Sequence, residues 1–116
     1  MKNIPEITIQ ELALKLKHGD KFVILDVREI WETDLARIND ERAILLPMSR
    51  IAREQKEAFP PALCDLQTEI LVMCHHGIRS ADVTDWMRQQ GWKNVFSLAG
   101  GIAAYAEQVD PSVGVY

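Results

Sequence analysis

One short run of residues combines a nucleophile, a fixed positive charge and a turn-forming glycine: Cys74-His75-His76-Gly77-Ile78-Arg79-Ser80. A backbone that turns through the glycine and enters a helix near the serine can point several amide N–H groups at one spot. Such a cradle binds an anion, and it lowers the pKa of a cysteine inside it because the thiolate is itself an anion. Cys74 is therefore a candidate nucleophile. The candidates for substrate binding are the other loop residues, His75, His76, Gly77, Ile78, Arg79 and Ser80.

Several residues of this run also allow a purely structural interpretation. Cys74 could be a small buried apolar side chain at the end of a strand. Arg79 could contact the substrate, or it could brace the loop by pairing with Asp26 or Glu29. The two histidines could attract an anion when protonated, but the sequence favours exposed loop positions for both.

The second cysteine lies in a different sequence context. Cys64 belongs to a segment that we expect to bury Leu63 and Leu66, so we interpret it as a packed or half-exposed bystander, with a resolving thiol as the alternative. Two cysteines are too few for a disulfide framework, and reduced thiols are the default. A zinc site built from both cysteines and the adjacent histidines matches no familiar ligand spacing. We expect no metal or organic cofactor.

Four short apolar runs predict the strands that position these residues: 22–25, 43–46, 70–73 and 95–98. Each run is continuous and ends at a polar, proline or glycine loop, which is typical of a buried parallel strand. The cysteine loop follows the third run directly. Because ligands of open α/β sheets bind beyond the carboxyl ends of the strands, we expect the loops after these runs to form the site.

Helical segments alternate with the strands. A capping box predicts a helix over about 9–18, and further helices are expected through the fifties, from about 80 to 90 and from about 102 to 109. The residues expected to cap or end these helices are Thr8 and Gly19, Ser49, Ser80 and Gly91, and Asp110. This alternation predicts a mostly parallel sheet with helices on both faces.

Two further loops supply candidate supporting residues. Asp26, Arg28 and Glu29 follow the first apolar run, and we expect them to form a charged network that orients the arginine of the cysteine loop. Gly100 and Gly101 follow the last run and would allow a close backbone approach to that loop. We interpret the three tryptophans as packing residues: Trp31, Trp86 and Trp92.

Length and composition indicate one ordinary globular domain spanning residues 1–116. The chain is 47% hydrophobic and 26% charged, with a net charge of -4, which argues against a binder of nucleic acid or anionic membranes. Pro5 and Glu6 stand where a signal peptide needs apolar residues, and no apolar run approaches a membrane span. We expect a cytoplasmic protein.

The chain resembles the single-domain rhodaneses, a sulfurtransferase family, over essentially its whole length. The resemblance rests on Asp26-Val27-Arg28-Glu29, on the cysteine loop and on Leu98-Ala99-Gly100-Gly101-Ile102, in this order and spacing. It implies a mainly parallel five-stranded sheet flanked by helices, a short additional strand near Ile7, and a persulfide on Cys74 during turnover. The loop lacks the early Lys or Arg of the members that use thiosulfate.

The implied reaction moves a sulfane sulfur from a donor such as thiosulfate to a thiol or cyanide acceptor through the persulfide. An alternative is a sulfur carrier that passes the sulfur to an acceptor protein. A cysteine phosphatase or arsenate reductase is less well matched, because four residues separate Cys74 from Arg79 where the phosphatase pattern has five. A noncatalytic binding module is disfavoured by the presence of the cysteine.

Overall fold

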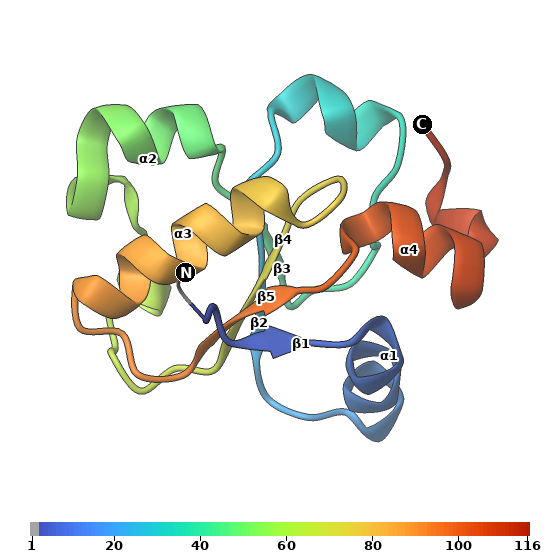
Figure 1. The fold of residues 1–116 in the computed structure, drawn as a ribbon, viewed down its shortest axis with the longest axis horizontal. Coiled ribbons are helices and arrows are strands. Elements are labelled where there is room, and N and C mark those ends of the chain that lie inside the picture. The colour runs from blue at the N-terminus through green and yellow to red at the C-terminus, as the bar shows by residue number, and fades with distance from the viewer. Residues whose placement is uncertain (1–2) are drawn as a thin grey trace.

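The structure, a computed structural model, describes residues 3–116 and contains a five-stranded sheet in the order β1-β5-β4-β2-β3 (Figure 1). All four strand pairs are parallel. The strands are β1 (Glu6–Ile7), β2 (Val23–Asp26), β3 (Ala43–Leu45), β4 (Ile70–Met73) and β5 (Val95–Leu98). The parallel α/β fold predicted from the alternating pattern is confirmed, and so is the short first strand implied by the family resemblance.

The central strand β4 shows why the apolar runs are continuous. Ile70 and Val72 belong to the core on one face of the sheet, and Leu71 and Met73 belong to the core on the other face. All four residues are buried. Because successive side chains point to opposite faces, a strand covered on both sides needs an apolar residue at every position.

Four helices cover the two faces, with α2 and α3 on one side of the sheet and α1 and α4 on the other (Figure 1). They are α1 (Ile9–His18), α2 (Met48–Glu54), α3 (Ile78–Gln89) and α4 (Gly101–Gln108). The capping box of α1 is present, and Gly19 closes that helix with φ +70°. Among the described residues, no helix is long and apolar enough to cross a membrane.

Two predicted helix caps are wrong. Ser49 does not cap α2, which begins directly after Pro47, and the Ser49 hydroxyl donates to Glu29 Oε1 at 2.7 Å instead. Ser80 does not cap α3, because the helix begins two residues earlier, after Gly77. In both cases the serine hydroxyl forms a hydrogen bond with a distant residue, Glu29 for Ser49 and Ser97 for Ser80. These tertiary contacts outweigh the local preference for a hydroxyl at the helix cap.

The expected burial of two apolar side chains is also wrong. Trp31 is 61% exposed and Leu66 is 42% exposed. The other tryptophans pack as predicted: Trp92 is buried and donates its indole N–H to the Leu63 carbonyl at 2.8 Å, and Trp86 packs on Phe59.

Candidate active site

The carboxyl ends of β2, β4 and β5 meet at one edge of the sheet, as the parallel order requires. Asp26 ends β2, Cys74 follows β4 and Gly100 follows β5. The backbone ties these ends together, since the Val27 amide donates to the Met73 carbonyl at 3.0 Å. The predicted loops therefore come together in the structure.

Cys74 is 1% exposed, and its sulfur lies inside the turn that follows β4. The backbone amides of Gly77 and Ser80 donate to Cys74 Sγ at 3.1 and 3.3 Å. The Cys74 thiol donates to Ser80 Oγ at 3.4 Å, and Ser80 Oγ lies 2.8 Å from Ser97 Oγ. Two amide donors thus converge on one sulfur, which is the arrangement that stabilises a negative charge there.

The turn depends on the backbone conformation of Gly77. Its φ of +103° lies in the left-handed region, which side chains with a Cβ rarely adopt. A Cβ at this position would also stand 3.2 Å from the Gly100 amide nitrogen, across the gap between two loops. Gly77 takes the position before α3 that Ser80 was expected to take, and this leaves the Ser80 amide free to contact the sulfur.

The start of α4 fixes the cysteine loop from the other side. The amides of Ile102 and Ala103 donate to the carbonyls of Cys74 and His75, both at 3.0 Å. A Cβ on Gly101 would lie 2.6 Å from the Cys74 carbonyl oxygen, a distance that real Cβ atoms essentially never show. The close approach expected of the glycine pair is therefore observed, and it turns the loop carbonyls away from the sulfur and towards α4.

Arg79 braces the loop, but its partner is not the expected one. Its guanidinium makes two hydrogen bonds to the carboxylate of Glu32, at 2.7 and 2.9 Å, rather than to Asp26 or Glu29. Glu32 is 3% exposed and lies in the 3₁₀ segment Ile30–Asp34. The hydrogen bonds from Arg79 lower the pKa of Glu32 from 4.5 to about 2, against the effect of burial. The same ion pair raises the pKa of Arg79.

The charged network behind Arg79 is more extended than predicted. Arg28 is fully buried and donates to both oxygens of Asp26, at 2.9 and 2.7 Å. A third nitrogen of Arg28 donates to Tyr116 Oη at 3.1 Å, and Tyr116 Oη donates to Glu32 Oε1 at 3.0 Å. Burial raises the pKa of the Tyr116 phenol. Arg28 also donates to the Glu32 carbonyl at 3.3 Å. Asp26 and Arg28 are thus connected to Arg79 through Glu32 and Tyr116, two residues that the sequence pattern did not single out.

The two histidines have different surroundings. His75 is half-buried, stacks on the Tyr116 ring at a centroid distance of 3.7 Å, and places Nε2 2.7 Å from the Tyr116 carbonyl oxygen. His76 is exposed, and its ring lies 3.8 Å from that of His75. The expectation of an exposed loop position holds for His76 and is wrong for His75, which connects the cysteine loop to the C-terminal residues.

The second cysteine does not join the site. Cys64 is exposed and contacts the carbonyls of Phe59 and Pro60, before β4. Within residues 3–116, no group of three or more His, Cys, Asp or Glu side chains could hold a metal ion.

The protein is thus a parallel α/β domain in which the central strand leads into a loop whose backbone amides donate to a cysteine sulfur. The family model for the rhodanese-like domain matches residues 8–108, and the chain belongs to this family. The crystal structure of a rhodanese-related protein from Thermoplasma volcanium superposes with a TM-score of 0.73 at 28% identity, covering 90% of this chain and 93% of that one.

Curated relatives are longer proteins. The chain is 31% identical over 118 residues to the Rhodanese-like/PpiC domain-containing protein 12 of Arabidopsis thaliana, and 28% identical over 112 residues to an adenylyltransferase and sulfurtransferase of Zea mays. These matches cover 97% and 95% of this chain but only 38% and 23% of the two relatives. Another relative is named a tRNA uridine(34) hydroxylase, so membership establishes the family and not the reaction.

Proposed function

We propose that the protein is a sulfurtransferase that carries a sulfane sulfur as a persulfide on Cys74. The observation that carries the proposal is the buried sulfur with two backbone amides directed at it, at 3.1 and 3.3 Å. A persulfide extends the side chain by one sulfur and keeps the negative charge near these donors. Membership of the rhodanese-like family and the sulfurtransferase among its relatives support the same reaction.

The reaction needs two displacement steps. The Cys74 thiolate attacks the outer sulfur of thiosulfate, a new S–S bond forms, and sulfite leaves with the electron pair of the old one. An acceptor thiolate or cyanide then attacks the outer sulfur of the persulfide, and Cys74 leaves as the thiolate. The loop amides stabilise the charge on sulfur in both steps without moving.

Phosphate chemistry is less well supported by the same loop. An arginine that serves a phosphate directs its N–H groups at it, whereas Arg79 directs two of its five N–H groups at Glu32. The shorter loop, with four residues between Cys74 and Arg79, also leaves less room for a tetrahedral anion.

The test is to incubate the protein with excess thiosulfate and no acceptor. We expect the intact mass to rise by one sulfur atom and peptide mapping to assign it to Cys74. Cys64→Ala serves as the matched control and should load normally, whereas Cys74→Ala should not load. A modification that persists in Cys74→Ala, or that maps to Cys64, would refute the proposal.

A further inference from the structure

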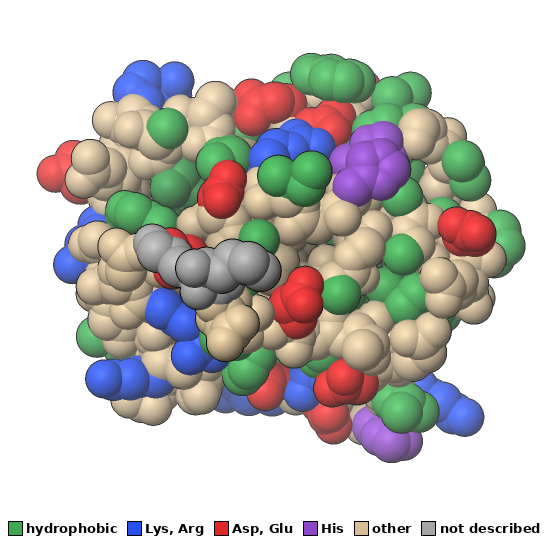
Figure 2. Space-filling view, viewed as in Figure 1, with side chains coloured by type: hydrophobic (Ala, Val, Ile, Leu, Met, Phe, Trp, Pro, Cys, Tyr) green, Lys and Arg blue, Asp and Glu red, His purple; other side chains and the backbone are tan. Residues whose placement is uncertain are grey.

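The surroundings of the cysteine loop are strongly acidic. Residues 26–35 and 74–82 together contain five carboxylates and two arginines, a net charge of -3 in a chain whose total is -4. In the space-filling view, acidic, basic and hydrophobic side chains gather around the histidines beside the loop that precedes α3 (Figure 2). This excess of negative charge favours a basic partner at the mouth of the site.

Neither arginine of these two segments offsets that charge for an incoming ligand. Arg79 is occupied by Glu32, and Arg28 is fully buried against Asp26. Both guanidinium groups in these two described segments are therefore already paired with a carboxylate. The charge complements a basic partner.

Exposed apolar side chains stand on the same two segments. Ile30 is 70% exposed, Trp31 61% and Ile78 76%. Ile78 directly follows Gly77, whose amide donates to Cys74 Sγ, and Ile30 and Trp31 precede Glu32, the partner of Arg79. Exposed large apolar residues on segments that the Arg79–Glu32 ion pair joins are consistent with a protein interaction site.

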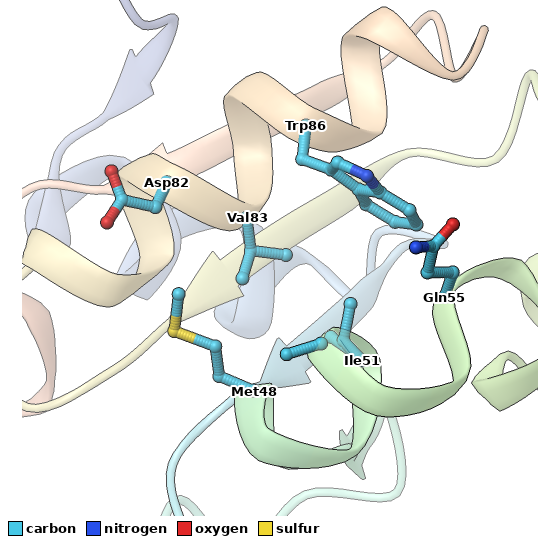
Figure 3. Close-up of a pocket in the computed structure, with 7 residues that line it drawn as sticks. Met48, Ile51, Gln55, Asp82, Val83 and Trp86 are labelled. Carbon is cyan, nitrogen blue, oxygen red and sulfur yellow. The ribbon is translucent and has the colours of Figure 1, made fainter.

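A second apolar feature, a groove, lies between α2 and α3. Met48 and Ile51 of α2 face Val83 and Trp86 of α3, with Asp82 near one end and Gln55 near the other (Figure 3). The groove has a volume of about 230 Å³, enough for one large side chain.

The groove adjoins the candidate active site at the end marked by Asp82. Asp82 stands three residues after Arg79 on α3. The Met48 amide donates to the Val27 carbonyl at 2.9 Å, which ties the start of α2 to the loop after β2.

We propose that this surface docks a basic, apolar segment of a partner protein that presents a cysteine thiol to Cys74. An apolar side chain of the segment fills the groove and a lysine or arginine pairs with Asp82. A second copy of this chain would bring the same negative charge to the contact and is disfavoured for that reason.

The inference rests on the proposed function and names the acceptor. The partner's thiolate attacks the outer sulfur of the Cys74 persulfide, the new S–S bond forms on the partner, and the electron pair of the broken bond returns to Cys74 Sγ. The total number of sulfur atoms and electrons is unchanged, so no external oxidant or reductant is needed.

Three synthetic peptides of equal length test the docking chemistry: Leu-Lys-Cys-Lys-Leu, Leu-Glu-Cys-Glu-Leu and Gly-Lys-Cys-Lys-Gly. The persulfide is loaded first and verified by mass. The transfer rate to each peptide is then divided by the rate to cyanide for the same variant. We expect the basic apolar peptide to give the highest ratio, and we expect added salt to lower it.

Protein variants distinguish docking from the intrinsic reactivity of each peptide thiol, because that reactivity does not change from one variant to the next. Asp82→Lys should lower the ratio for the basic apolar peptide about fivefold at low salt and raise it for the acidic one. The matched control is Glu107→Lys on α4, another exposed helical carboxylate. Ala52→Phe, which plugs the groove from an exposed position, should abolish the advantage of leucine over glycine, whereas Ala62→Phe should not.

The possible outcomes are distinct. A chain that never acquires the persulfide contradicts the proposed function. A loaded chain in which Asp82→Lys and Glu107→Lys give equal ratios, or in which the acidic peptide is the best acceptor, contradicts the docking inference alone. A dimer in sedimentation that disappears in Ala52→Phe would assign the groove to a second copy and would also overturn it.

Discussion

Replacing Glu32 by glutamine tests whether the buried carboxylate anchors the cysteine loop. The substitution keeps the shape of the side chain but removes the charge that accepts both hydrogen bonds from Arg79. A pKa of about 2 in place of 4.5 corresponds to about 3 kcal/mol of stabilisation. Because the Arg79 side chain is 34% exposed, solvent screens part of this energy, and we expect Glu32→Gln to cost about 1–2 kcal/mol at pH 7.

The pH dependence gives the prediction its sign. The folded protein lowers the pKa of Glu32, so its contribution is complete above pH 4.5 and is lost as the pH falls towards 2. Glu32→Gln has no such contribution to lose. The difference in unfolding free energy between the two proteins should therefore narrow by roughly half between pH 7 and pH 3.

Urea unfolding, followed by tryptophan fluorescence at pH 7, 5 and 3, measures this difference directly. Other titrating groups, such as Asp40 with its own lowered pKa, affect both proteins equally and cancel in the comparison. Glu107→Gln serves as the control and should differ little from the wild type at each pH. A Glu32→Gln difference that stays constant from pH 7 to pH 3 would show that the ion pair is not the source of the stabilisation.

Two further predictions concern the loop itself. The rate at which iodoacetamide alkylates Cys74 should fall in Arg79→Ala and fall further in Gly77→Val, since a β-branched residue at φ +103° distorts the amide cradle. A reactivity profile unchanged by Gly77→Val would contradict activation by the backbone. Hydrolysis of an aryl phosphate should stay at background because the loop between Cys74 and Arg79 is one residue shorter than in the phosphatase pattern, and efficient turnover that Cys74→Ser abolishes would favour the phosphatase alternative.

The sequence predicted those parts of the fold and site that depend on local patterns. The continuous run Ile70–Met73, followed at once by a cysteine and a glycine turn, predicted a buried strand ending at an anion cradle, and both features are present. The capping box of α1 was predictable because it needs only two residues three positions apart. The side chains of Thr8 and Glu11 each accept a hydrogen bond from the other residue's backbone amide.

The missed parts depend on contacts between distant segments. Glu32 and Arg79 are 47 residues apart, and nothing near Glu32 marks it as buried, since Ile30 and Trp31 beside it are exposed. Asp26 and Glu29 were better candidates for Arg79 because they directly follow the apolar run 22–25, at the strand end where the site was expected. No sequence pattern near Tyr116 indicated its role either. Its hydroxyl joins two charged side chains from a distant segment, Arg28 and Glu32, as tyrosines do in buried hydrogen-bond networks.

The network changes how the positive charge near Cys74 is interpreted. An arginine five residues after a cysteine suggests activation by a cation, but the structure pairs Arg79 with Glu32 and Arg28 with Asp26, so each positive charge is compensated locally. The uncompensated donors that point at Cys74 Sγ are the backbone amides of the turn. Because partial charges of amides act at short range while the surrounding carboxylates act over several ångströms, the site can hold one anionic sulfur while its surroundings carry an excess of negative charge. A cationic thiol-bearing segment is the acceptor that we propose for this arrangement.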